Sequence, residues 1–236
     1  MNDMTTPETT PGAVPRQRKE RKENADKRRQ QLLDATWRSI AQNGLGRTTL
    51  ATVAAEAGLS QGVAVFYFKS KAGLLIEALR DHYARYQENW ERALKAAGDD
   101  PAEQLIALIR ADFDEDICNP EALSIWYAFW GEMKFTSQYA EISSQFDAAR
   151  EQAMRAVCGK LMGDAPGAEI ARTAQWIDTF SDGFWQRLHV FPGNYDAQSA
   201  LRETLLMAGR LVPQVAGRIE QNLAADAGRA RRLRER

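Results

Sequence analysis

The sequence predicts an all-α protein, with a small N-terminal three-helix helix-turn-helix domain followed by a larger helical body. Three observations support this fold class. From residue 25 onward apolar residues recur every three to four positions, capping Ser, Thr, Asp and Asn residues precede these segments, and no segment alternates apolar and polar residues as a strand does. With 236 residues, 44% hydrophobic and 27% charged, the chain can bury a sizeable core and is not wholly disordered.

The first part of the chain is predicted to be an arm followed by four helices. Residues 1–24 begin rich in Thr and Pro and become basic, so we expect a disordered basic arm. Beyond it, capping hydroxyl residues and stopping glycines delimit the helices. These are 25–43, which Gly44 ends in a left-handed conformation; 50–57, capped by Thr49 and ended by Gly58; 61–67, capped by Ser60; and 71 to about 97, capped by Ser70.

Later helices open with a capping residue followed by proline. Asp100-Pro101-Ala102-Glu103 combines a capping acid, a first-turn proline and a glutamate three residues after the cap. Asn119-Pro120-Glu121 repeats the arrangement before a helix to about Met133. Further helices are expected at 137–161, 168–190 and 195–212. The predicted divisions are 25–72 for the helix-turn-helix, 73–212 for the body, and 213–236 for an Arg-rich C-terminal tail.

Composition excludes several classes of protein. The longest stretch without a charged side chain, 57–68, is twelve residues, short of the roughly 20 that a membrane span needs. No secretory signal is visible, so we expect a cytoplasmic protein with no membrane partner, in which Cys118 and Cys158 are reduced and buried. No metal-ligand spacing, phosphate loop or catalytic triad can be assembled, so we expect no metal, no cofactor and no catalytic residue.

The net charge of −1 conceals basic ends and an acidic middle. Residues 16–29 carry +5 and residues 229–236 carry +4, whereas residues 30–228 carry −8. A basic arm leading into a folded segment suits a polyanion, and an acidic body repels one. Any nucleic-acid contact should therefore lie near the N-terminus, although basic tails can also serve solubility alone.

The segment 48–75, TTLATVAAEAGLSQGVAVFYFKSKAGLL, predicts the functional unit. Gly58 permits a tight reversal, Leu59 fills the core and Ser60 starts the second helix, so the two short helices form a helix-turn-helix. That geometry leaves the second helix projecting, as in proteins that present side chains to the major groove of DNA.

The same residues resemble the DNA-binding domain of the TetR family. The resemblance rests on Thr49, residues 53–60 (VAAEAGLS), Gly62, residues 67–71 (YFKSK) and Leu74-Leu75, and it covers residues 25–75. It implies a two-fold homodimer with an N-terminal DNA-binding domain and a ligand-sensing body. Most members repress transcription until a small-molecule effector binds.

Three blocks of the body look like BetI-type regulators, which control glycine-betaine synthesis and respond to choline. They are residues 113–115 (FDE), 126–130 (WYAFW) and 182–187 (DGFWQR). The resemblance implies that the body binds ligand and dimerises. The helices at 168–190 and 195–212 would then pack against their mates in a four-helix interface.

DNA contacts are expected at two sets of residues. Thr48 or Thr49, Tyr67 and Lys71 match family positions that touch the DNA backbone, although Thr49 could be only a cap and Tyr67 only a core ring. Base reading is expected from Gln61, Gly62, Val63, Ala64, Val65 and Phe66. Gln61 can pair with adenine, and valine can pack on a thymine methyl group. Val65 and Phe66 replace the polar or imidazole side chains of BetI-type proteins, which predicts a different operator.

The acidic, aromatic body suggests a cationic ligand such as a quaternary ammonium compound. Ring faces are expected from Phe113, Trp126, Tyr127, Phe129, Trp130, Trp176 and Trp185. Asp112 and Asp116 share a helical stripe with buried apolar residues, so at least one carboxylate should point inward and require a partner. His82 on the long helix is expected to be solvated or hydrogen-bonded.

Several alternatives stay open at this point. The aromatic residues could be ordinary core, with Asp112 paired to an arginine. A regulator of this class could sense an apolar or polyamine ligand, or could activate rather than repress. A helical partner-binding protein without operator preference, and an enzyme with an aromatic pocket, are the other candidate classes.

Overall fold

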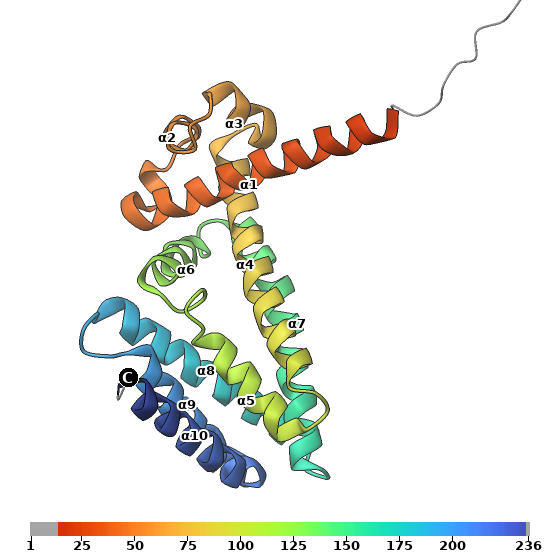
Figure 1. Ribbon diagram of the computed structural model, residues 1–236, viewed down its shortest axis with the longest axis vertical. Helices are drawn as coiled ribbons and strands as arrows, with labels where there is room; N and C mark the ends of the chain where they lie inside the picture. Colours follow the sequence, from red (N-terminus) through yellow and green to blue (C-terminus); the bar gives the residue numbers. More distant parts are fainter. Residues whose placement is uncertain (1–13, 235–236) are drawn as a thin grey trace, which may run out of the picture.

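The computed structural model describes residues 14–234, and within them the chain is helical with no β-strand beyond an isolated bridge between Pro192 and Tyr195 (Figure 1). The all-α prediction is therefore confirmed. The helices are α1 (Val14–Arg47), α2 (Leu50–Glu56), α3 (Gln61–Phe68), α4 (Lys71–Ala96), α5 (Pro101–Asp112), α6 (Pro120–Glu132), α7 (Ser137–Met162), α8 (Gly167–Val190), α9 (Ala197–Leu211), η1 (Pro213–Val215) and α10 (Ala216–Arg234).

The N-terminal unit is built from α1, α2, α3 and the first turns of α4. Leu32 and Leu33 of α1 are fully buried against apolar side chains of the other three helices. At the end of α1, Gly44 has φ 73° and ψ 170°, so the helical conformation stops where the sequence predicts a left-handed glycine. The unit has its own small core, separate from that of the body.

The predicted disorder of the arm is wrong for residues 14–24. Helix α1 begins at Val14, eleven residues before the predicted start, and continues into the DNA-binding unit without a break. After Pro15 this segment consists of Arg, Gln, Lys, Glu and Asn, mostly good helix formers. Lys19 and Glu23 form an ion pair across one helical turn. Residues 1–13 of the predicted arm lie outside the described residues.

The long helix α4 joins the N-terminal unit to the body and runs along one side of the body (Figure 1). Helix α7 runs beside α4, and α5 contacts both of them. Helix α8 packs on α7, α9 on α8, and α10 on α9. The core between them is apolar and includes Trp90, Ile109 and Ile177. Cys118 and Cys158 are free and buried, as expected.

Residues 213–234 are not a tail outside the body. Val215 and Ile219 are almost fully buried, and Arg110 of α5 forms an ion pair with Asp226 of α10. Gly209 of α9 allows the close approach, because a Cβ there would lie 3.4 Å from the Cα of Ala216. The many arginines of this segment suggested a solvent-exposed tail, although apolar residues within it pack on the body.

Among the described residues, no helix has both the length and the apolar character needed to cross a membrane.

Candidate functional site

Helix α3 projects from the N-terminal unit as the sequence predicts. Ala64 and Phe68 anchor one side of the helix in the small core, and the opposite side faces solvent. Gln61 and Gly62 are exposed there, and Phe66 is 68% exposed. An apolar side chain of this size at the surface suits contact with another molecule rather than with water.

The turn between α2 and α3 is built by local capping. Thr49 and Thr52 form a reciprocal cap at the start of α2, in which the Thr52 backbone N–H donates to the Thr49 hydroxyl at 3.1 Å. Gly58 has φ 66°, which glycine adopts without strain, and the chain reverses there. Ser60 precedes α3 in an extended conformation but makes no side-chain cap.

Two of the expected DNA contacts are contradicted by burial. Thr48 is fully buried, where its hydroxyl donates to the Gly44 carbonyl at 3.0 Å and lies 3.1 Å from the Ser39 hydroxyl. Ala64 is also fully buried, because it is the contact of α3 with the core. Thr49 remains half-buried as a cap, and Tyr67 is half-buried beside Phe66.

Two lysines lie at the end of α3. The Lys71 ammonium donates to the Gly46 carbonyl at 2.6 Å and so ties the start of α4 to the loop before α2. Lys69, which is not among the predicted contacts, is exposed, has φ 65° and places its ammonium 5.2 Å from the centre of the Phe66 ring. A basic residue directly after the recognition helix was the signal that could have identified it.

An aromatic pocket of about 390 Å³ lies within the body, between α4, α6, α7 and α8. Three tryptophan rings stand together in it, with the Trp185 ring centre 6.0 Å from that of Trp126 and 6.4 Å from that of Trp130. The full lining is Tyr83, Tyr86, Asp112, Trp126, Trp130, Asp147, Arg150, Glu151, Gln175, Asp178, Thr179, Asp182 and Trp185. We refer to it below as the aromatic pocket.

Hydrogen bonds hold Trp185, Tyr86 and Trp130 in place, whereas the buried indole N–H of Trp126 has no partner. The Trp185 indole N–H donates to the backbone carbonyl of Asp112 at 2.9 Å. The Tyr86 hydroxyl donates to the Asp112 carboxylate at 2.9 Å, and the Trp130 indole N–H lies 3.5 Å from the Tyr83 hydroxyl. The pocket is thus ordered by its own polar contacts before any ligand enters.

Arg150 of α7 is the buried cation of the pocket. Its Nη2 donates to both Asp112 oxygens at 3.1 Å and to Asp178 at 3.3 Å. This confirms the alternative in which Asp112 pairs with an arginine. The Nε and Nη1 groups of Arg150 are also buried but have no hydrogen-bond partner, so three N–H donors on these two nitrogens remain to be satisfied.

The pocket holds more negative than positive groups. Asp112, Asp147, Glu151, Asp178 and Asp182 line it together with one guanidinium. Loss of hydration raises the pKa of Asp178 to about 6, although Arg150 opposes the shift. Loss of hydration and then repulsion from Asp112 and Asp178 raise the pKa of Asp182 to about 7. An added cation would relieve this repulsion.

The structure brings together four of the nine predicted ligand residues, and Tyr127, which stacks on His189, is among those left outside the pocket. Asp112, Trp126, Trp130 and Trp185 line the aromatic pocket. Phe113 and Phe129 are instead buried in the core, where Phe129 packs on Tyr139. Trp176 is 51% exposed on α8 with Arg172 over its ring, so it points away from the pocket.

Asp116 also lies away from the aromatic pocket, because α5 ends at Asp112 and the helical stripe does not continue. The pocket is also lined by residues that were not predicted from the sequence, among them Tyr83, Tyr86, Asp147, Arg150, Asp178 and Asp182. Asp178, Asp182 and Trp185 recur at four- and three-residue spacing on α8, a signal that was available in the sequence.

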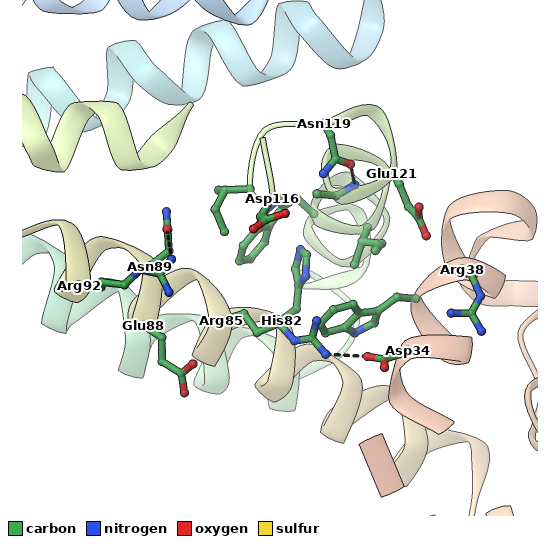
Figure 2. Close-up of a pocket in the computed structure, with 15 residues that line it drawn as sticks. Asp34, Arg38, His82, Arg85, Glu88, Asn89, Arg92, Asp116, Asn119 and Glu121 are labelled. Carbon is green, nitrogen blue, oxygen red and sulfur yellow. Dashed lines mark hydrogen bonds and ion pairs between the residues drawn. The ribbon is translucent and has the colours of Figure 1, made fainter. Parts of the chain in front are cut away.

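A second pocket of about 570 Å³ lies where α1, α4 and α6 meet, at the junction of the two units (Figure 2). Trp126 lines both pockets. Across the junction, Arg85 of α4 donates to Asp34 of α1 at 2.6 Å and lies 3.7 Å from the centre of the Trp37 ring. We call this the junction pocket.

His82 of α4 stands in the junction pocket between two tryptophans. Its ring centre is 5.4 Å from that of Trp37 and 4.2 Å from that of Trp126. The histidine is hydrogen-bonded to the backbone of Ala122, as expected, but its Nε2 is buried without a partner. Burial, followed by the positive charge of Arg85, lowers the pKa of His82 to about 3, so the ring is neutral near pH 7.

An exposed recognition helix, joined by one long helix to a body with a preformed pocket, defines a helix-turn-helix regulator of transcription. Comparison with known families agrees. Residues 32–78 match the model for bacterial regulatory proteins of the tetR family, and residues 101–208 match that for the C-terminal part of BetI-type transcriptional repressors.

The chain is 31% identical over 175 residues to the HTH-type transcriptional regulator BetI of Stenotrophomonas maltophilia, which covers 74% of this chain and 88% of the relative. It is 32% identical to that of Paraburkholderia xenovorans over the same shares. The chain belongs to the TetR family of transcriptional regulators and carries a BetI-type C-terminal domain. Members of this family bind operator DNA, typically as dimers with small-molecule effectors, and are not enzymes.

Solved structures share the fold at lower identity. A transcriptional regulator of Pseudomonas aeruginosa superposes with a TM-score of 0.70 at 19% identity, covering 83% of this chain and 94% of the other. A regulator of Saccharomonospora viridis, solved in complex with choline, superposes with a TM-score of 0.66 at 19% identity, covering 76% and 94%.

Proposed function

We propose that this protein is a homodimeric repressor that leaves its operator when a quaternary ammonium compound, with choline as the first candidate, occupies the aromatic pocket. The observation that supports this most directly is the combination in one cavity of three tryptophans with carboxylates that exceed the positive charge. The choline bound to the Saccharomonospora viridis regulator makes that ligand the natural first choice.

A quaternary ammonium group suits the pocket because it carries charge but no N–H donor. Ring faces attract such a cation, at about 0.5 to 2 kcal/mol for each well-placed ring. Carboxylates of Asp178 and Asp182 add longer-range attraction, and the cation would reduce the repulsion that raises their pKa values.

The unpaired donors of Arg150 favour a ligand with an oxygen atom. The hydroxyl oxygen of choline or the aldehyde oxygen of betaine aldehyde, three bonds from the ammonium nitrogen, could accept from Nε or Nη1, which otherwise stay unsatisfied. A purely apolar ligand would leave these donors and the carboxylates unpaired at a cost. A polyamine could pair with the carboxylates and is therefore the second candidate.

The dimer contact is proposed at the exposed face of α8. Trp176, Phe180 and Phe184 recur every four residues, and Phe180 and Phe184 pack edge to face at 5.3 Å. Val190 and Phe191 extend the exposed apolar surface at the end of the helix. A two-fold axis beside α8 and α9 would cover this surface and place two α3 helices in successive major grooves, about 34 to 36 Å apart.

The DNA contact is proposed at the exposed side of α3 and the lysines that follow it. Gln61, Gly62, Val63, Val65 and Phe66 face the base edges, while Thr49, Tyr67, Lys69 and Lys71 contact phosphates. A protein with this role acts where the bacterial chromosome is, in the cytoplasm.

Trp126 is the proposed link between ligand and DNA. A cation that displaces Trp126 in the aromatic pocket also changes the junction pocket, because the same indole forms a wall of both. His82 would pass the displacement to Trp37 of α1 and so change the orientation of the N-terminal unit. The ligand then shifts the equilibrium by its differential affinity for the two arrangements.

Calorimetry with choline and betaine aldehyde tests the proposed ligand. The matched comparison is 3,3-dimethylbutanol, which has the shape of choline without the charge, and spermidine represents the polyamines. We expect choline or betaine aldehyde to bind and the neutral analogue to bind at least tenfold more weakly. Undetectable binding of both cations at millimolar concentration would retire this ligand and leave DNA binding untouched.

A further inference from the structure

We propose that the N-terminal extension of α1, residues 19–29, is a second DNA-binding element that grips the phosphate backbone beside the base pairs read by α3. This inference rests on the proposed DNA contact of α3 and extends it. The extension lies outside both the family-model match at residues 32–78 and the helix-turn-helix motif. We refer to residues 19–29 as the basic rod.

The basic rod continues α1 beyond the small core. Figure 1 shows α1 running past α2 and α3 and on beyond them as a single helix. Of residues 19–28, all except the half-buried Ala25 are exposed. At 1.5 Å per residue, Arg21 stands about 12 Å further along the helix axis than Arg29. Such an unsupported charged helix needs a purpose other than packing.

Four of the six basic residues of the rod lie on one side of the helix. Arg28 stands four residues before Leu32, and Arg21 stands seven before Arg28. Lys22 and Arg29 repeat this spacing ahead of Leu33. Because Leu32 and Leu33 define the buried side of α1, these four basic residues lie on the same side of the helix as the core contacts. The acidic residues Glu20 and Glu23 lie on the other side, and Asp26, seven residues before Leu33, lies at the edge of the basic side.

The contacts of Arg29 show which helices the basic face of the rod faces. Its guanidinium lies 6.0 Å from the centre of the Phe68 ring, at the end of α3, and pairs with Glu77 of α4. The next positions along that face, Arg28, Lys22 and Arg21, therefore flank the recognition helix beyond its end. In the described part of the chain none of these three has a carboxylate partner, whereas Lys19 on the other face pairs with Glu23.

Unpaired basic side chains in line with a DNA-reading helix fit a polyanion. The body, with its excess of acidic residues, offers no such surface. A duplex seated on α3 would continue past the end of that helix, and its flanking phosphates are the negative groups at this position. The contacts would add affinity for any sequence and would not read bases.

The test compares two doubly substituted full-length proteins of equal charge. R21Q/R28Q removes two arginines from the basic face, and K19Q/K27Q removes two lysines from the opposite side of the same helix. The probe is a fluorescein-labelled duplex of about 40 base pairs that the parent protein enriches from a random library, long enough to include the flanks of two half-sites. Affinity is measured by anisotropy from about 50 to 200 mM salt.

R21Q/R28Q is expected to bind about tenfold more weakly at physiological salt. Each phosphate contact contributes about 0.9 to the slope of log affinity against log salt, so the slope of the dimer should fall by about 2 to 4. K19Q/K27Q should change the slope by less than about 1. Hydroxyl-radical footprints should lose their outermost protected phosphates in R21Q/R28Q only. Helix content and melting temperature identify any misfolded variant. In the separate variant R21K/R28K, which keeps both positive charges, binding should be restored.

Equal slopes for the two variants, or a slope for R21Q/R28Q that matches the parent, would overturn the role of the basic rod while the contact through α3 stands. A parent protein that enriches no duplex at all would overturn the proposed DNA contact, and the rod with it.

Discussion

His82 packs against Trp126 with 4.2 Å between the ring centres, and this contact joins the wall of the aromatic pocket to the helix that carries the DNA-binding unit. The imidazole touches Trp37 of α1 on its other side. Three aromatic side chains from α6, α4 and α1 therefore lie in sequence between the ligand pocket and the recognition unit. Closely packed interiors transmit displacement rather than absorb it.

Replacing His82 should separate ligand binding from operator release. In His82→Leu the aromatic pocket keeps its tryptophans, so we expect the choline Kd to stay within about threefold of the parent. Loss of the aromatic contact should raise the choline concentration that releases the operator by about 5- to 150-fold, the range of typical coupling energies. Calorimetry gives the first quantity and duplex release, followed by anisotropy, gives the second.

The chain offers a matched control in its other histidine. His189 stacks on Tyr127 at 4.7 Å and does not line either pocket. His189→Leu should leave both binding and release unchanged. If His82→Leu and His189→Leu release the operator as the parent does, the aromatic link through His82 carries no coupling.

Ligand binding should depend on pH through Asp178 and Asp182. Their pKa values of about 6 and about 7 mean that the free pocket retains protons that the cation must displace. Because the cation favours the ionised carboxylates, affinity should rise as pH increases from about 6 to 8, by at most tenfold per pH unit for each proton released. Calorimetry in buffers of different ionisation heat counts these protons.

Asp182→Asn removes the carboxyl group that has the larger of the two pKa shifts. The amide cannot ionise, so the pH dependence should flatten and the choline Kd at pH 8 should weaken. An unchanged pH profile in this variant would show that Asp182 does not face the bound cation.

The DNA-binding unit was predictable because its determinants are local. Thr49, Gly58 and Ser70 fix helix ends within a few residues of themselves, and the structure places those ends within one residue of the prediction. The ligand pocket depends on contacts between distant helices. Arg150 meets Asp112 from 38 residues away, and nothing near either residue in the sequence indicates the pairing.

Helix orientation explains the other errors. Asp116 does not lie on the helical stripe predicted from the sequence, because Phe113, with φ −112° and ψ 14°, departs from the helical conformation and ends α5. Trp176 and Trp185 share α8, yet one faces solvent and the other the pocket, since their nine-residue separation rotates them apart by about 180° at 3.6 residues per turn. Composition identifies such a set of aromatic rings, but only tertiary packing determines which rings face the pocket and which face solvent.

Trp176→Arg should disrupt the dimer without affecting the ligand pocket. Two charged side chains facing each other across a two-fold axis oppose association. We expect a monomer in analytical ultracentrifugation, at least a hundredfold loss of operator affinity, and an unchanged choline Kd. Phe135→Arg is the control, because Phe135 is 77% exposed and lies outside α8. If the Trp176→Arg protein stays dimeric and loses choline binding, Trp176 belongs to the ligand site and not to the dimer contact.

Lys71→Ala should weaken binding to every DNA sequence alike, because a lysine that contacts phosphate carries no base information. The slope of log affinity against log salt should fall by about one unit for each lost contact. Lys71 also donates to the Gly46 carbonyl, so part of the loss could come from a loosened loop before α2. Lys71→Gln separates the two causes, since its amide can still donate to that carbonyl but brings no charge. A lowered slope in both variants assigns Lys71 to a phosphate. A parental slope in Lys71→Gln assigns Lys71 to the loop alone.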